Sequence, residues 1–254
     1  MAKISRRSFL KAAGSASVLP GVIGAGGLGA AAEAEASETT AKARPATSGY
    51  LFFTPHEAAF IEAACARLIP FDEVGPGAVE AGVPNYLDKQ LGGAWGAGER
   101  LYRNGPWQAG TPSQGYQLPF TPAELFRNAL RGVEADLKAQ GKAQGKGFTA
   151  LSGDDQDAYL KSLEAGGKDL NGVPSELFFQ TLLGMTVEGY FSDPAYGGNK
   201  DMAAWKMIGF PGAYASYYDL VDQHGVKLAR APMSIADAPP MEHMHQGPDI
   251  PAKL

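Results

Sequence analysis

The chain has 254 residues, of which 44% are hydrophobic and 19% are charged, and this is the composition of a soluble globular protein. A chain of this length can bury a substantial core in one large domain or two small ones. Its net charge of −5 provides no broad basic surface for nucleic acid or anionic lipid, so we expect no nucleic-acid partner.

Residues 1–36 are predicted to be an export signal and not part of the fold. The letters SRRSFLK at residues 5–11 match the twin-arginine consensus, and an Ala/Gly-rich segment follows them up to small residues suited to signal peptidase. The high density of Gly and Pro favours a cleaved signal over a permanent membrane helix. The letters GAGGLG at residues 24–29 fit the dinucleotide-binding pattern, but we reject a cofactor site inside a segment that is removed.

Helices are predicted from their capping signals and from the spacing of apolar residues. Thr54 and Glu57 can form a capping box that opens a helix ending before Pro70. Thr121 and Glu124 repeat the same device for a second, amphipathic helix. Further helices are expected at residues 84–91, 152–163, 174–190 and 213–223.

Strand signals are scarce, so we predict a mostly α fold: an irregular small helical domain with long Gly/Pro/aromatic connections. This domain is expected to span residues 53–230. It follows a flexible leader at residues 37–52 and precedes an extended or disordered tail at residues 231–254. The irregular section from residue 70 to 119 is longer than compact domains ordinarily tolerate, unless it is functional or bound to something.

Residues that could carry chemistry are few. The single cysteine, Cys65, excludes an internal disulfide, an iron–sulfur cluster and a four-cysteine zinc site, and its apolar helical face predicts a buried thiol. The histidines His56 and His224 have no catalytic partner that the sequence identifies. Asp155 is better explained as a capping acid for Ser152 than as a calcium ligand. We therefore predict no catalytic, cofactor-binding or metal-binding residue in this chain.

Two alternatives of other classes stay open. Met241, His243, Met244 and His245 offer thioether and imidazole donors, so the chain is alternatively a metal-binding periplasmic protein that uses this tail. The other alternative is a self-sufficient periplasmic oxidoreductase, which would use Asp193, Tyr196 and Asp201.

Residues 188–212 read EGYFSDPAYGGNKDMAAWKMIGFPG, a run of aromatics, glycines and prolines with an Asn-Lys-Asp triplet. Its aromatic side chains can serve as core or interface anchors, and its polar ones can cap the next helix or meet partner groups. We take this stretch as a candidate partner interface. Its candidate residues are Tyr190, Phe191, Asp193, Tyr196, Asn199, Trp205, Lys206 and Phe210.

The letters PFDEVGPGAVEAGVP at residues 70–84 and the stretch at residues 188–212 resemble the gluconate 2-dehydrogenase subunit 3 family. The resemblance implies a small subunit of a heteromeric, membrane-associated, FAD-dependent sugar or sugar-acid dehydrogenase. In such complexes a large subunit of the glucose–methanol–choline oxidoreductase type holds FAD. A multihaem c-type cytochrome, where present, passes electrons to quinone. No catalytic residue of the family maps onto this chain.

These observations lead to one hypothesis for the function. Twin-arginine export carries folded proteins, often with a cofactor already inserted, yet the sequence shows no site for one. We expect the FAD to belong to the flavoprotein partner, which crosses through the twin-arginine translocase attached to this chain. The complex would then lie in the periplasm, at the outer face of the cytoplasmic membrane. The small subunit would support maturation, export and stability of the flavoprotein.

Overall fold

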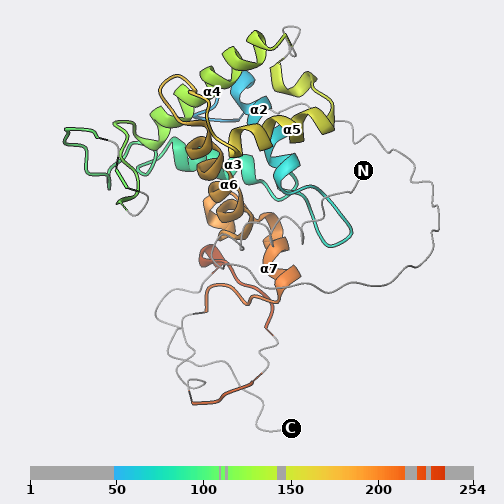
Figure 1. Ribbon diagram of the computed structural model, residues 1–254. Helices are drawn as coiled ribbons and strands as arrows, with labels where there is room; N and C mark the ends of the chain where they lie inside the picture. Colours follow the sequence, from blue (N-terminus) through green and yellow to red (C-terminus); the bar gives the residue numbers. More distant parts are fainter. Residues whose placement is uncertain are drawn as a thin grey trace, which may run out of the picture. The chain divides into compact units, whose positions relative to one another are not determined.

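A computed structural model describes residues 49–108, 110–111, 114–141, 147–214, 222–226 and 230–237. The export signal, most of the leader, most of the helix expected at residues 213–223 and the His/Met residues at 241–245 lie outside the described residues. Figure 1 shows the order of the helices along the chain.

The described residues are mostly helical, which confirms the predicted fold class. Within those ranges the β structure consists of isolated bridges, such as Asp72 with Gly75 and Gly212 with Met233, and no sheet forms. The α-helices are α2 (Pro55–Leu68), α3 (Val83–Leu91), α4 (Pro122–Ala139), α5 (Gly153–Glu164), α6 (Ser175–Phe191) and α7 (Ala203–Ile208).

The predicted capping boxes are present and explain where α2 and α4 begin. The Thr54 hydroxyl accepts from the Glu57 amide, and the Glu57 carboxylate accepts from the Thr54 amide at 2.8 Å. Thr121 and Glu124 make the same pair of bonds at α4. Each such cap stabilises its helix by about 1 kcal/mol. Because these signals are local, the sequence located both helix starts.

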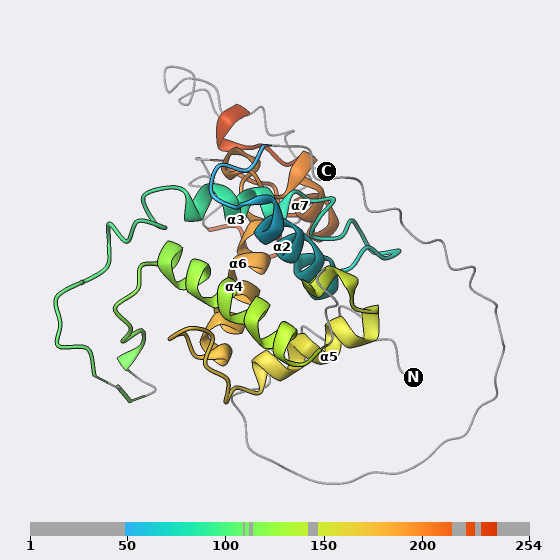
Figure 2. The same cartoon turned by 90° about the horizontal axis from the view of Figure 1, so that it is seen from above.

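Helix α6 is the centre of the packing, and it contacts α2, α3, α4, α5 and α7 (Figure 2). Phe178 of α6 is fully buried, with its ring centroid 5.4 Å from that of Phe126 on α4 and 6.3 Å from that of Phe60 on α2. A helix enclosed on several sides must be apolar around most of its circumference. The C-terminal end of α6 leads into residues 192–212, so this core positions the candidate interface.

A buried carboxylate on α3 fixes the entry of the chain into the fold. Asp88 accepts hydrogen bonds from three successive backbone amides, those of Leu51, Phe52 and Phe53, at 2.7 to 2.9 Å. The Arg127 side chain also bonds to the Phe52 carbonyl and lies 4.0 Å above the Phe52 ring. Residues 51 and 52, which composition assigns to the leader, are therefore attached to α3 and α4.

Candidate partner-binding surface

The two stretches that carry the family resemblance lie against each other, although more than 100 residues separate them in sequence. The Lys200 amide donates to the Ala81 carbonyl at 2.9 Å, and the Tyr190 hydroxyl donates to the Pro76 carbonyl at 2.8 Å. Gly82, with φ of 77°, permits this approach, because a Cβ atom there would lie 3.1 Å from the Gly197 carbonyl oxygen. Residues 70–84 and 188–212 thus form one structural unit.

A tight turn in the first stretch presents two apolar side chains to solvent. The Asp72 carboxylate accepts from the amides of Val74 and Gly75 at 2.9 and 3.2 Å, and the Asp72 amide donates to the Gly75 carbonyl. On this turn Phe71 is 72% exposed and Val74 is 63% exposed. Because these hydrogen bonds fix the backbone of the turn, binding here costs little backbone ordering, so this geometry suits an interface anchor.

Asn199 joins the end of α6 to the start of α7. It is fully buried; its side-chain amide donates to the Ser192 carbonyl, and its Oδ1 accepts from the Ala204 amide, both at 2.9 Å. Asn199, Asp201 and Met202 all have positive φ, between 45° and 58°. Such conformations cost a non-glycine residue about 1–2 kcal/mol each and need surrounding contacts to hold them. Of the roles expected for Asn199, the one in the structure is bonding to the following helix.

Asp193 attaches a distant segment to the end of α6. Its carboxylate accepts from the Ala195 amide at 2.9 Å, the Ser234 hydroxyl at 2.6 Å and the Ile235 amide at 2.8 Å. Partial burial raises the pKa of Asp193. The hydrogen bonds from Ser234, Ala195 and Ile235 together lower the pKa by more than burial raises it, so the net pKa lies below the ordinary value. Residues 234 and 235, which composition places in the tail, are therefore bound to the helical core.

Trp205 and Tyr190 are core residues of this chain. Trp205 is 5% exposed; its indole N–H donates to the Phe191 carbonyl at 2.8 Å, and its ring meets Phe210 edge-to-face at 5.2 Å. Tyr190 is equally enclosed, with its hydroxyl on Pro76. Neither side chain is accessible to a partner while the described fold is intact.

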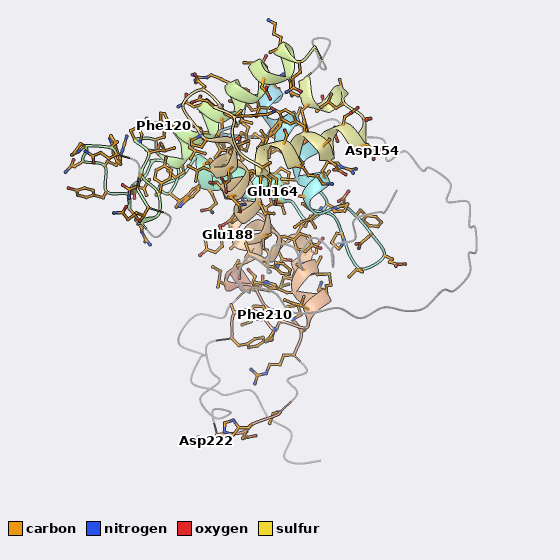
Figure 3. All side chains as sticks on the ribbon, viewed as in Figure 1. Phe120, Asp154, Glu164, Glu188, Phe210 and Asp222 are labelled. Carbon is orange, nitrogen blue, oxygen red and sulfur yellow. The ribbon has the colours of Figure 1, made fainter. Side chains whose placement is uncertain are left out.

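The side chains of the remaining interface candidates are at least partly exposed to solvent. Tyr196 and Lys206 are exposed, Phe191 and Asp193 are partly exposed, and Phe210 is 46% exposed. Phe210 lies in the segment that follows α7 (Figure 3), and its neighbour Ile208 is exposed as well. The candidate interface residues predicted from the sequence did not include the exposed Phe71, Val74 and Ile208. The accessible apolar side chains of the two packed stretches are Phe71, Val74, Tyr196, Ile208 and Phe210.

In the described ranges no cluster of three His, Cys, Asp or Glu residues is placed to hold a metal ion. Burial raises the pKa of the Cys65 thiol to about 12, and its sulfur lies 3.7 Å from the Thr186 hydroxyl. No helix among the described residues combines the length and apolar character that a membrane span requires.

A pocket of about 220 Å³ lies between α2, α4 and the 3-10 helix η2 (Gly147–Ala150). Its wall is largely apolar, with Phe60, Leu130 and Phe148 among the lining residues, and His56 and Glu134 also line it. None of the eight interface candidates lines this pocket. It is thus a feature separate from the two packed stretches.

Fold and surface together define a small, mostly helical protein that exposes apolar side chains on two stretches packed against each other. Residues 55–212 match the family model described as gluconate 2-dehydrogenase subunit 3. The match covers 158 of the 254 residues, and the chain belongs to this family. Membership implies a subunit of a multisubunit gluconate dehydrogenase complex. No curated protein and no solved structure matches the chain.

Proposed function

We propose that this chain is the non-catalytic small subunit of a periplasmic, FAD-dependent gluconate or sugar dehydrogenase complex. It binds the flavoprotein subunit of the glucose–methanol–choline type, supports its maturation and stability, and carries it through the twin-arginine translocase. FAD belongs to that partner, and haem c belongs to a cytochrome subunit where the complex has one.

Family membership over residues 55–212 is the observation that carries this proposal. The accessible apolar side chains of the two packed stretches support it, because Phe71, which is 72% exposed, and Phe210, which is 46% exposed, present apolar surface that suits an interface. The three hydrogen bonds on the Asp193 carboxylate also favour a structural over a catalytic role for that residue.

The test is to express the flavoprotein subunit with this chain, without it, or with the Arg6→Lys/Arg7→Lys variant. Dehydrogenase activity towards a panel of sugars and sugar acids is then measured in periplasm and cytoplasm with an artificial electron acceptor. With the native chain, activity appears in the periplasm. The double-lysine variant retains the flavoprotein complex in the cytoplasm, because the translocase no longer recognises the signal.

Omitting the chain removes periplasmic activity and lowers the amount of mature flavoprotein in either compartment. Restoring the native chain on a plasmid is the control, and it returns activity to the periplasm. Undiminished periplasmic activity in the absence of the chain contradicts the proposal.

A further inference from the structure

Residues 95–108 form a segment, here called the aromatic arm, that leaves the helical body after α3. Figures 1 and 2 show the green segment between α3 and α4 extending away from the helices in both views. Every residue from Leu101 to Gln108 is exposed. Among them are Tyr102, which is 80% exposed, and Trp107, which is 38% exposed. The arm thus presents large aromatic side chains that the described residues leave largely or partly accessible.

The base of the arm is fixed on the body. The Gly96 amide donates to the Gln90 carbonyl at the end of α3, and the Gly96 carbonyl accepts from the Ala123 amide in the first turn of α4, both at 3.1 Å. A Cβ atom at position 96 would lie 1.9 Å from the Leu91 carbonyl oxygen, so only glycine fits there. The arm therefore leaves the body from a defined place, unlike a loose terminal tail.

Beyond its base, the arm makes few bonds to the rest of the chain. No backbone amide or carbonyl of residues 102–108 forms a hydrogen bond with any residue that the structure describes. One exposed ion pair, Arg103 with Glu124 at 3.6 Å, connects it to α4. Long loops without secondary structure of their own are uncommon in compact domains unless they serve a function. The surface of a partner could cover the aromatic rings and form hydrogen bonds with the backbone groups of the arm at the same time.

The composition of the arm fits a protein surface. It holds two Trp, one Tyr, two Arg and one Glu and has no Lys or Asp, and enrichment in Trp, Tyr and Arg is typical of protein interfaces. Segments that bind anionic lipid are marked by clusters of roughly 4–8 basic residues. The arm offers Arg100 and Arg103, and Arg103 is paired with Glu124. A protein partner is accordingly favoured over a membrane.

We propose that the aromatic arm is a docking element for the flavoprotein subunit, with Tyr102 and Trp107 as its anchors. This inference rests on the proposed function, since it takes the flavoprotein as the partner. The arm adds a second contact region, distinct in sequence from the two packed stretches. The flavoprotein must then offer apolar pockets for the two rings and polar groups for the backbone between them.

The test uses the full chain, tagged and co-expressed with the glucose–methanol–choline-type flavoprotein subunit of the same organism. The Tyr102→Ser/Trp107→Ser variant is compared with Leu51→Ser/Val226→Ser, which alters exposed apolar side chains outside the arm. We expect the arm variant to weaken binding of the flavoprotein about 10-fold or more, and the control to stay within about 2-fold of the native chain. The native chain, the arm variant and the control variant should have the same melting temperature. If the arm double variant melts at a lower temperature, flavoprotein binding is measured with the single variant Tyr102→Ser in its place.

Native binding by the arm variant overturns the inference and leaves the proposed function standing. If even the native chain fails to retain the flavoprotein, the proposed function fails and the inference falls with it. Sedimentation with vesicles of phosphatidylglycerol and phosphatidylethanolamine provides a further outcome. If the arm variant loses vesicle binding but keeps flavoprotein binding, the arm is a membrane element and the inference is wrong.

Discussion

Replacing Trp205 by alanine is expected to destabilise the subunit itself. Trp205 is 5% exposed, and its indole N–H is bonded to the Phe191 carbonyl at the end of α6. Removing a buried tryptophan costs about 3–5 kcal/mol through lost contacts and the cavity left behind. For a domain of this size, each kcal/mol lowers the melting temperature by about 2–4 °C, so we expect a fall of about 10 °C.

The assay is thermal unfolding of the purified chain followed by circular dichroism. Trp205→Phe is the first comparison: it keeps a ring against Phe210 but removes the hydrogen bond, and should cost about 1–2 kcal/mol. Phe210→Ala is the second, because Phe210 is 46% exposed and should cost about 1 kcal/mol or less. If Trp205→Ala kept the native melting temperature yet failed to bind the flavoprotein, Trp205 would be an interface anchor and our account of it as a core residue would be refuted.

Three further predictions concern the same region and the core. Gly198→Ala should destabilise the fold, because its Cβ would lie 2.1 Å from the Gly189 carbonyl oxygen, and urea unfolding measures this loss. Gly209→Ala is the control: position 209 has open space but positive φ, so this variant reports backbone strain without a clash. The pKa of Asp193 is lower in the folded than in the unfolded chain, so its stabilising contribution is present above about pH 4 and is lost as the pH falls through the folded pKa. Asp193→Asn should remove this part of the acid dependence of the melting temperature, and an unchanged acid profile would contradict the assignment. Cys65 should resist iodoacetamide at pH 8 in the native protein and react in urea, because its thiol is buried with a pKa of about 12; rapid native labelling would show that the core is open.

Local capping signals located the starts of three helices, and the helices expected at residues 84–91 and 174–190 also form, as α3 and α6, without a side-chain cap. Thr54 with Glu57, Thr121 with Glu124, and Ser152 with the Asp155 amide lie within three residues of each other, so short-range chemistry locates the helix starts. Helix α7 was not predicted. It follows Asn199, Asp201 and Met202, whose left-handed backbone is held by contacts that include Ser192 and Ala81, and such contacts have no local signature.

Which of the candidate interface residues are accessible could not be predicted from the sequence, for the same reason. The sequence marked residues 188–212 as unusual but could not separate Trp205, which is buried, from Phe210, which is half-exposed. Burial is decided by the packing of this stretch on residues 70–84, a contact between segments far apart in sequence. Asp88 did carry a signal that was missed: it is an acidic residue on the buried face of α3, beside Leu87 and Leu91. A charge in that position predicts buried hydrogen-bond partners.

The most direct test of the central claim is the composition of the native particle. The chain, with its signal intact and a C-terminal tag, is expressed with the flavoprotein subunit and purified from the periplasm by affinity and size exclusion with light scattering. Our account predicts one particle that contains both polypeptides, shows flavin absorbance and oxidises a sugar or sugar acid. Elution of the chain alone and without flavin, while the flavoprotein is active and separate in the same periplasmic fraction, would contradict it.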